Sequence, residues 1–271
     1  MKIAVLNPGS MGISVAAALK SATHEVYWLN EKRSQATIDR AKNIGLSELT
    51  ALEQLAEVDG IVSVCPPHAA LAVATQVKTT GFKGLYLDAN AISPETSAQV
   101  AQIIGTGFVD GGLIGPPVHK RGTTRLYLSG MDRMFVQNWF KGSVLDTVTM
   151  DDLSGSASAL KMCYAAYTKG LSALTLVVRA LAKEQRVEQT LLEEWHLSLP
   201  HLPDHCEKIV QGTASKAWRF SGEMKEIAST FSAASLPDGF HLAAAEVYDR
   251  MSGLKHETDV SLDRVLQEIL T

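Results

Sequence analysis

The first twenty residues constrain the fold of this chain more than any other segment. An apolar run over residues 2–6 enters a short turn containing Gly9 and Gly12, and a helical pattern follows at once. Short apolar runs and helical stretches keep alternating through the first half of the chain, which is typical of a parallel sheet covered by helices on both faces. We expect strands at residues 2–6, 25–29, 60–65, 84–88, 107–111, 125–129 and 144–149, and helices at residues 11–21, 33–43, 69–79 and 94–104.

The second half of the chain has a different pattern. After about residue 153 the strand signals stop, and apolar residues recur at helical spacing, starting with a long and largely apolar segment near residue 156. A chain of 271 residues is also long enough for two domains. The sequence therefore predicts an α/β fold with an N-terminal, Rossmann-type, doubly wound parallel sheet (residues 1–152) and an all-helical C-terminal domain (residues 153–271).

Composition excludes several classes of partner. The net charge of −4 and the pI near 6.1 give no broad positive field for nucleic acid. The apolar stretches are shorter than the roughly 20 residues that a membrane span needs. The chain begins directly with a strand pattern, which leaves no room for a signal peptide, so we expect a cytoplasmic protein. Its three cysteines lack CxxC spacing, which favours reduced thiols over a disulfide framework or a zinc site.

The glycine turn after the first strand predicts a dinucleotide-binding loop. Gly9 lets the backbone approach a pyrophosphate, Gly12 allows close packing of helix on strand, and the helix N-terminus attracts negative charge. The usual first glycine of this motif is replaced by Asn7, a residue type that tolerates unusual turn dihedrals. The predicted phosphate loop consists of Asn7, Pro8, Gly9, Ser10, Met11 and Gly12.

The end of the second strand favours NADP over NAD. NAD-binding proteins usually carry an acid here that binds the ribose 2′-hydroxyl, whereas this chain has Asn30. Lys32, Arg33 and Ser34 follow, and the Arg33 guanidinium can bind phosphate oxygens with two donors. The alternative is a solvated charged turn in which Glu31 binds the ribose.

Two further loops lie at the carboxyl ends of expected strands, where ligands bind in such folds. Cys65, Pro66 and His68 belong to the first loop and are predicted to contact the cofactor, although His68 fits a surface position equally well. Asn90 belongs to the second loop. Its amide can both donate and accept, so it is predicted to hold a nicotinamide ribose or a substrate hydroxyl.

Lys161 is the candidate acid/base. It stands among hydrophobic residues near the start of the long apolar helix, so burial should lower its pKa toward the working pH, as a proton donor and acceptor requires. Tyr164 lies one turn further along the same face. The alternative is that Lys161 extends its amine to solvent, as most lysines do.

Taken in order, four segments resemble the β-hydroxyacid dehydrogenases, the family of 3-hydroxyisobutyrate and 6-phosphogluconate dehydrogenases. They are residues 9–12, 88–94, 108–115 and 155–161, and residues 155–174, 223–228 and 237–241 are similar to a poorly characterised phosphogluconate dehydrogenase-like branch. The resemblance implies the two-domain fold, a nicotinamide cofactor and Lys161 as acid/base. The resemblance does not identify the substrate, because the family's substrate-binding residues are changed. Ile114, Gly115 and Pro116 stand where the family has a carboxylate-binding serine and paired glycines. Ala165 replaces an asparagine, and Glu223-Met224 replaces a Lys-Asp pair.

The resulting prediction is an NADP-dependent dehydrogenase or reductase acting on a small hydroxyacid or a related alcohol or carbonyl compound. Lys161 would exchange the hydroxyl proton while hydride moves to or from the nicotinamide. His241 fits a core or interface position as well as a substrate site. The predicted substrate-binding residues are Asn90, Gly111, Gly112, Ile114, Gly115, Tyr164, Glu223 and His241.

Alternative functions stay open at this stage. An imine reductase on the same scaffold would suit the loss of the carboxylate-binding serine, and a cofactor-binding regulatory protein would need no chemistry. Metal dependence through His196, His201, His205 and Cys206 is disfavoured, because their spacing matches no compact site, and no metal is predicted. The apolar C-terminal helices predict a homodimer.

Overall fold

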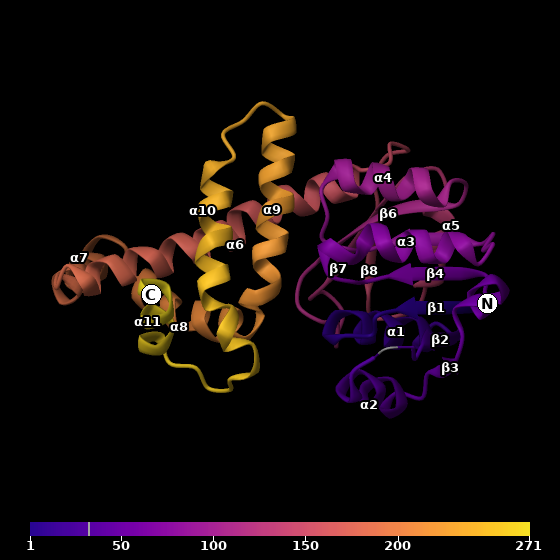
Figure 1. Cartoon of the computed structure of the whole chain (residues 1–271), viewed down its shortest axis with the longest axis horizontal. Helices are drawn as coiled ribbons and strands as arrows, with labels where there is room; N and C mark the ends of the chain where they lie inside the picture. The colour runs from indigo at the N-terminus through magenta and orange to yellow at the C-terminus, as the bar shows by residue number, and fades with distance from the viewer. Residues whose placement is uncertain (32) are drawn as a thin grey trace. The chain divides into compact units, whose positions relative to one another are not determined.

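An eight-stranded sheet organises the first part of the chain, with the strand order β3-β2-β1-β4-β5-β6-β7-β8 (Figure 1). Strands β1 to β6 run parallel, β7 pairs antiparallel with β6, and β8 pairs parallel with β7. The chain crosses over between β3 and β4, so β1 and β4 are neighbours, and this reversal of strand order marks the usual ligand crevice of such sheets. The strands are β1 Lys2–Leu6, β2 Glu25–Leu29, β3 Ser47–Leu49, β4 Gly60–Ser63, β5 Leu85–Asp88, β6 Phe108–Ile114, β7 Arg125–Ser129 and β8 Asp146–Thr149.

Helices cover both faces of this sheet, which explains why its central strands are apolar on both sides. Val15 and Leu19 of α1 pack with Trp139 of α5 in one hydrophobic core. Ala74 of α3 and Val100 of α4 belong to a second core. The doubly wound, Rossmann-type sheet predicted from the sequence is thus confirmed. The helical elements of this part are α1 Ser10–Ser21, α2 Gln35–Asn43, η1 Leu52–Glu57, η2 Pro67–Ala69, α3 Ala70–Thr79, α4 Pro94–Ile104 and α5 Arg133–Trp139.

The second part of the chain is helical, as predicted. Over the described residues from 163 onward, no strand is present. Helices α9 and α10 pair side by side and bury Met224, Ile227 and Tyr248 (Figure 1). The elements are α6 Ser156–Glu184, α7 Glu188–Ser198, α8 Leu202–Thr213, η3 Ala214–Lys216, α9 Ala217–Ala233, α10 Gly239–Arg250, η4 Met251–His256 and α11 Leu262–Leu270.

Two sequence-based expectations about strands were wrong. The three-residue strand β3 was missed, because two of its side chains are exposed and it carries no apolar run. Strand β6 was expected to end at residue 111 but continues to Ile114. Gly111 and Gly112 lie inside the strand at points of close packing.

The computed structural model describes residues 1–31 and 33–271, and of these it leaves out the side chains of residues 204, 205, 207 and 256. The chain divides into two compact units, Met1–Met162 and Cys163–Thr271. The predicted division after residue 152 places all of α6 in the helical domain, whereas the first turns of α6 pack with the sheet. No described helix is long and apolar enough to span a membrane.

Candidate functional site

The loop between β1 and α1 has the geometry of a phosphate-binding turn. Asn7 adopts a left-handed conformation, with φ of 61°, and its carbonyl oxygen accepts a hydrogen bond from Gly9 N at 2.7 Å. A Cβ atom on Gly12 would lie 2.6 Å from that same carbonyl oxygen. Gly12 therefore cannot be replaced without moving the loop, and Asn7 supplies the turn that a glycine usually makes.

The same loop leaves polar groups for a ligand. No side chain caps the N-terminus of α1, so the N–H groups of its first turn point out of the helix end. The Asn7 Oδ1 atom is buried and has no hydrogen-bond partner in the protein. Unsatisfied N–H groups and the positive end of the helix dipole suit an anion. The residues present therefore fit the pyrophosphate of a dinucleotide.

The region after β2 carries the predicted 2′-phosphate residues. Arg33 lies half-buried, its Nε donates to Leu29 O at 3.3 Å, and burial lowers the pKa of its guanidinium. Asn30 turns its amide toward Glu48 of β3, donating to the carboxylate at 2.6 Å. Ser34 precedes α2 and bonds Thr37 through its hydroxyl at 3.1 Å. Lys32 lies outside the described residues.

A buried polar network joins the ends of β4 and β5. Asn90 is only 2% exposed, and its Oδ1 accepts from Cys65 N at 2.6 Å. Its Nδ2 donates to Asp88 Oδ2 at 2.9 Å and to Ser63 Oγ at 3.2 Å. A direct bond from this amide to a ligand would require these internal bonds to break. The structure instead makes Asn90 the residue that holds the loop beginning at Cys65 against β5.

Burial strongly perturbs two titratable groups in this network. Desolvation, together with the nearby Asp110 carboxylate, raises the pKa of Asp88 from 3.8 to about 7, although two hydrogen bonds from Asn90 oppose the change. Burial likewise raises the pKa of the Cys65 thiol to about 12, which makes the thiol unreactive at neutral pH. Pro66 and His68 lie beyond this network, and the His68 side chain is exposed.

Lys161 lies on the second turn of α6 and points back to the sheet. Its side chain is half-buried, and Nζ donates to Leu113 O at 2.7 Å. Leu113 is near the carboxyl end of β6, one strand beyond Asp88 on β5. The amine is thus held by the sheet rather than extended away from it, which is the first requirement for an acid/base at this edge. Its role stays a prediction.

Four predicted substrate residues lie on or just after β6. Gly111 and Gly112 are buried within the strand and pair with Leu128 and Tyr127 of β7. A Cβ atom on Gly111 would lie 2.8 Å from Asp88 O, and one on Gly112 would lie 2.6 Å from Ala157 O of α6. These glycines serve packing between backbones. Ile114 is buried, whereas Gly115 is exposed and has φ of 129°.

Asp110 anchors the start of α6, a role that the sequence analysis missed. The side chain is fully buried, and Oδ2 accepts from Ser158 N and from Ser129 Oγ, each at 2.9 Å. Oδ1 accepts from the hydroxyls of Ser158, at 2.5 Å, and Ser97, at 3.0 Å. A carboxylate inside an otherwise apolar strand pattern was the available signal, because a buried charge needs several partners.

The other predicted substrate residues belong to the helical unit. Tyr164 is half-exposed on α6. Glu223 forms an ion pair with Lys169 at 2.7 Å, so its carboxylate already has a partner. His241 is buried against the Phe231 ring, with ring centroids 4.3 Å apart; its Nδ1 has no partner, and burial lowers the pKa of the imidazole. His241 therefore matches the core alternative as well as the ligand one.

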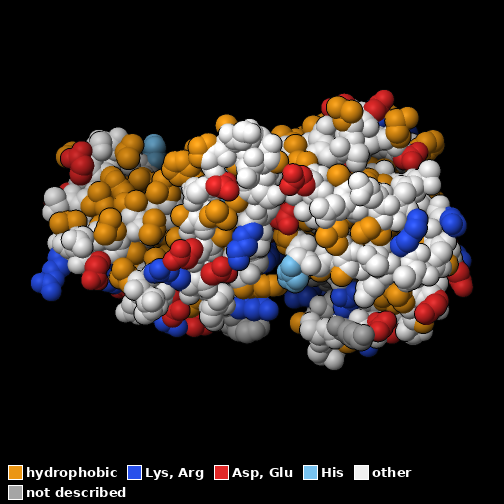
Figure 2. All heavy atoms as spheres, turned by 45° about the horizontal axis from the view of Figure 1, so that its top comes forward, with side chains coloured by type: hydrophobic (Ala, Val, Ile, Leu, Met, Phe, Trp, Pro, Cys, Tyr) orange, Lys and Arg blue, Asp and Glu red, His pale blue; other side chains and the backbone are white. Residues whose placement is uncertain are grey.

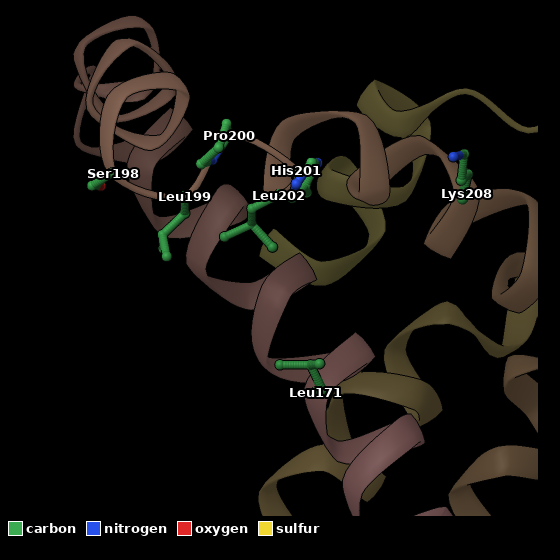
Figure 3. Close-up of a pocket in the computed structure, with 7 residues that line it drawn as sticks. All are labelled: Leu171, Ser198, Leu199, Pro200, His201, Leu202 and Lys208. Carbon is green, nitrogen blue, oxygen red and sulfur yellow. The ribbon is translucent and has the colours of Figure 1, made fainter.

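Two surface hollows among the described residues are lined by neither Lys161 nor the phosphate loop. One, of about 710 Å³, lies in the helical unit between Leu171 of α6, Lys208 of α8 and residues 198–202 (Figure 3). Another, of about 280 Å³, lies beside Phe108 and Gly130, at the opposite edge of the sheet from the carboxyl ends of β1 to β6. Among described residues no group of three metal-ligating side chains comes together, and the His205 side chain is outside the description.

Comparison with known proteins places these features in context. Residues 182–251 match a family model described as a domain of unknown function, DUF1932. An uncharacterised 28.5 kDa protein of Methanothermus fervidus is 29% identical over 195 residues, which covers 71% of this chain and 75% of that protein. Neither match describes an activity.

Solved structures give a broader match. A conserved protein of unknown function, reported as similar to 3-hydroxyacid dehydrogenases, is 26% identical with a TM-score of 0.66, over 94% of this chain and 98% of that one. The 3-hydroxyisobutyrate dehydrogenase of Salmonella typhimurium is 15% identical with a TM-score of 0.69, over 98% and 99% of the chains.

Further structural neighbours include reductases and cofactor complexes. A Streptomyces aurantiacus imine reductase is 17% identical with a TM-score of 0.52, over 98% of this chain and 99% of that one. A reductive aminase of Aspergillus terreus, solved with NADPH, is 13% identical with a TM-score of 0.55, over 98% of both chains. Prephenate dehydrogenase of A. aeolicus, solved with NAD+, is 12% identical with a TM-score of 0.58 over 87% of each chain. In fold and order of domains, the chain is β-hydroxyacid dehydrogenase-like, which confirms the resemblance seen in its sequence motifs.

Proposed function

We propose that the chain is an NADP-dependent oxidoreductase that acts on a small hydroxyacid or a related alcohol or carbonyl compound, with Lys161 as the acid/base. The observation that carries this proposal is the placement of Lys161. Its Nζ donates to Leu113 O at the carboxyl edge of the sheet, and both residues belong to the same compact unit as the phosphate loop. Ligands of doubly wound sheets bind at this edge.

The cofactor-binding residues are those whose geometry fits a dinucleotide. The uncapped N-terminus of α1 would hold the pyrophosphate with its free N–H groups, and Gly12 keeps the helix close to the loop. Bound NADP supplies hydride transfer. The chain's own contribution is to orient that group and to exclude water from it.

Lys161 would accept or donate the proton of the reaction. In the oxidative direction its neutral amine accepts the substrate hydroxyl proton, and in the reductive direction its ammonium donates a proton to the forming alkoxide. Leu113 O accepts a hydrogen bond from Nζ in either state and fixes where the nitrogen lies.

The preference for NADP rests on the region after β2. Asn30 donates to Glu48, so the side chain that replaces the usual ribose-binding acid is neutral and already engaged. Arg33 lies next to it, and its Nε is fixed by Leu29 O. A guanidinium held by one nitrogen can still present its other donors to phosphate oxygens.

Turnover tests this assignment. Purified protein is supplied with NADPH or NADP and a panel of hydroxyacids, aldehydes, ketones and imines, and the absorbance of the reduced nicotinamide is followed. Lys161→Ala should lower kcat by about 10²–10⁴-fold without changing NADPH affinity, the usual contribution of a general acid/base. The matched control is Lys78→Ala, because Lys78 Nζ also donates to a main-chain carbonyl, that of Ile104 at 3.0 Å. Bound NADPH without turnover of any compound would instead favour a regulatory cofactor-binding protein.

Imine reduction is the second candidate activity. Ile114 is buried where the resembling family carries a carboxylate-binding serine, so this position offers no hydroxyl to an acid substrate. Imine reductase and reductive aminase structures share the fold. Imines turned over faster than hydroxyacids in the same panel would favour this candidate, and hydroxyacids turned over faster would exclude it as the main activity.

We also propose that the chain forms a homodimer through α6. Tyr167, Leu174 and Leu181 recur every seven residues on this helix and are 72%, 58% and 58% exposed in the single chain. Figure 2 shows hydrophobic side chains gathering over the helical unit. Apolar side chains at seven-residue spacing form a stripe along a helix, which is the pattern that packs against another helix. A second copy would cover this stripe.

A reducing, cytoplasmic location fits the thiols. Cys65, Cys163 and Cys206 are all unpaired. Proteins of oxidising compartments tend to pair their cysteines. Fractionation of the cells that express the chain tests this location directly.

A further inference from the structure

Where β6 meets α6, a buried carboxylate of the strand binds the helix one turn before Lys161. Asp110 lies on β6 and has no exposed surface. Its two oxygens accept four hydrogen bonds, and two of these come from the main chain and side chain of Ser158 on α6. Ala157 N donates to Ser129 Oγ, which in turn donates to Asp110, so a further N–H group of the first turn is tied to the same carboxylate.

These bonds satisfy the start of α6 from the sheet. The first N–H groups of a helix have no partner within the helix and attract negative charge. Side chains near the helix start usually cap them, whereas here the acceptor comes from a strand 48 residues earlier in the chain. Four hydrogen bonds converge on this one carboxyl group, so the attachment is firm.

Two more contacts keep the helix in register beyond the first turn. Gly112 allows α6 to approach so closely that a Cβ atom would lie 2.6 Å from Ala157 O and 3.4 Å from Lys161 Cβ. Lys161 Nζ then reaches Leu113 O at 2.7 Å. Asp110, Gly112 and Leu113 thus contact the first two turns of α6, where Lys161 lies three residues after Ser158 and four after Ala157 and so on the same side of the helix as both.

We infer that Asp110 is a positioning residue for Lys161: its carboxylate fixes the start of α6 to β6 and thereby sets where the acid/base amine lies at the carboxyl edge of the sheet. This inference rests on the proposed function for its meaning, but the position of Lys161 is measurable without turnover. It also explains why the first turns of α6 belong to the unit that contains the phosphate loop rather than to the helical unit.

The test measures the rate at which the Lys161 amine of the full chain reacts with acetic anhydride at a series of pH values. Mass spectrometry of the peptide that contains Lys161 quantifies the acetylated fraction. Lys78 is the internal reference, since its Nζ also donates to a carbonyl in the same unit. Asp110→Asn keeps the shape of the side chain, but its amide nitrogen cannot accept from Ser158 N. Ser158→Ala is a milder variant that removes one hydroxyl contact. Ser97→Ala is the matched control, because Ser97 also donates to Asp110 Oδ1 but comes from α4.

Asp110→Asn and Ser158→Ala should raise the rate for Lys161 relative to Lys78 by about fivefold or more and shift its pH midpoint, whereas Ser97→Ala should change the ratio by less than about twofold. Unchanged Lys161 reactivity in folded Ser158→Ala and Asp110→Asn overturns the inference. If Asp110→Asn does not fold, Ser158→Ala decides alone. If Lys161→Ala abolishes turnover but the Asp110 and Ser158 variants leave the labelling of Lys161 unchanged, the proposed function stands without the positioning role. If those variants alter the labelling in a protein that turns over no compound, the positioning role stands without the proposed function.

Discussion

The two ends of α6 are built differently. Its first two turns are held by a buried carboxylate, by a glycine contact and by the bond from Lys161 to Leu113 O. Further along, Tyr167, Leu174 and Leu181 expose apolar side chains in the single chain. The first end is thus fixed by specific hydrogen bonds within its own chain, and the second end exposes an apolar surface.

This difference separates two tasks along one helix. The hydrogen bonds at the start are directional and have specific partners, so they fix the position of the Lys161 amine. The later turns need only apolar area, which is not directional. Changes at the start should therefore affect chemistry within one chain, and changes further along should affect assembly.

The largest effect is expected at the exposed stripe. Leu174→Lys combined with Leu181→Lys should convert the dimer to a monomer, because charged side chains would be buried against a second copy without partners. Light scattering after size-exclusion chromatography measures the particle mass. Lys83→Glu is a charge-changing control outside α6. A wild-type protein that is already monomeric would contradict the dimer, and a dimer that survives both substitutions would place its interface elsewhere.

A smaller effect is expected at the fixed end. Gly112→Ala should lower the free energy of unfolding by about 1–3 kcal/mol, because the new Cβ would overlap the Ala157 carbonyl oxygen. Turnover should fall as well, since Lys161 moves with that turn. Gly212→Ala on the exposed face of α8 is the matched control; open space surrounds it, so it should be neutral or stabilise by up to about 1 kcal/mol. Equal effects of the two substitutions on chemical denaturation would refute the close approach of α6 to β6.

A separate change concerns the pH dependence of stability near the fixed end. The pKa of Asp88 is raised to about 7 in the folded chain, so protonation favours the folded state. The stability from this group is fully present below its unfolded pKa of 3.8 and is lost as the pH rises through about 7. Asp88→Asn should lose that dependence.

The free energy of unfolding is measured from pH 5 to pH 8 for wild type and for Asp88→Asn. The difference between the two proteins at each pH isolates the contribution of the Asp88 carboxyl from that of the other titratable groups. Wild type should lose stability relative to the variant as the pH rises, by about 1.4 kcal/mol for each pH unit at most. Parallel curves for the two proteins would show that Asp88 titrates at its ordinary pKa in the folded chain.

The sequence predicted the fold well because its signals are local. Alternating apolar runs and glycine turns identify β1 to β8 with the exception of β3, which is too short and too exposed to leave a pattern. The glycine turn and Lys161 also stand out in the sequence, since Gly12 belongs to a motif and Lys161 lies in an apolar helix, and their roles stay predictions.

The parts of the site that the sequence did not predict depend on contacts between residues far apart in the sequence. Asn90 was predicted to bind a ligand, but Cys65 and Ser63, 25 and 27 residues away, already use its amide. Asp110 anchors Ser158 across 48 residues. Side-chain chemistry shows that such groups need partners, whereas only the folded chain shows whether the partner is internal or a ligand.

Nucleotide binding tests the central claim most directly. Wild-type protein is titrated with NADPH and with NADH, and ligand fluorescence is followed, with Arg33→Ala and, as a control in the helical unit, Arg264→Ala measured alongside. We predict tight NADPH binding and weaker NADH binding, with Arg33→Ala raising the Kd for NADPH by about tenfold, as expected for the loss of one charge-assisted contact, and Arg264→Ala leaving it unchanged. Failure of either nucleotide to bind would mean that the Asn7 turn does not form a phosphate site, and the oxidoreductase proposal would fall.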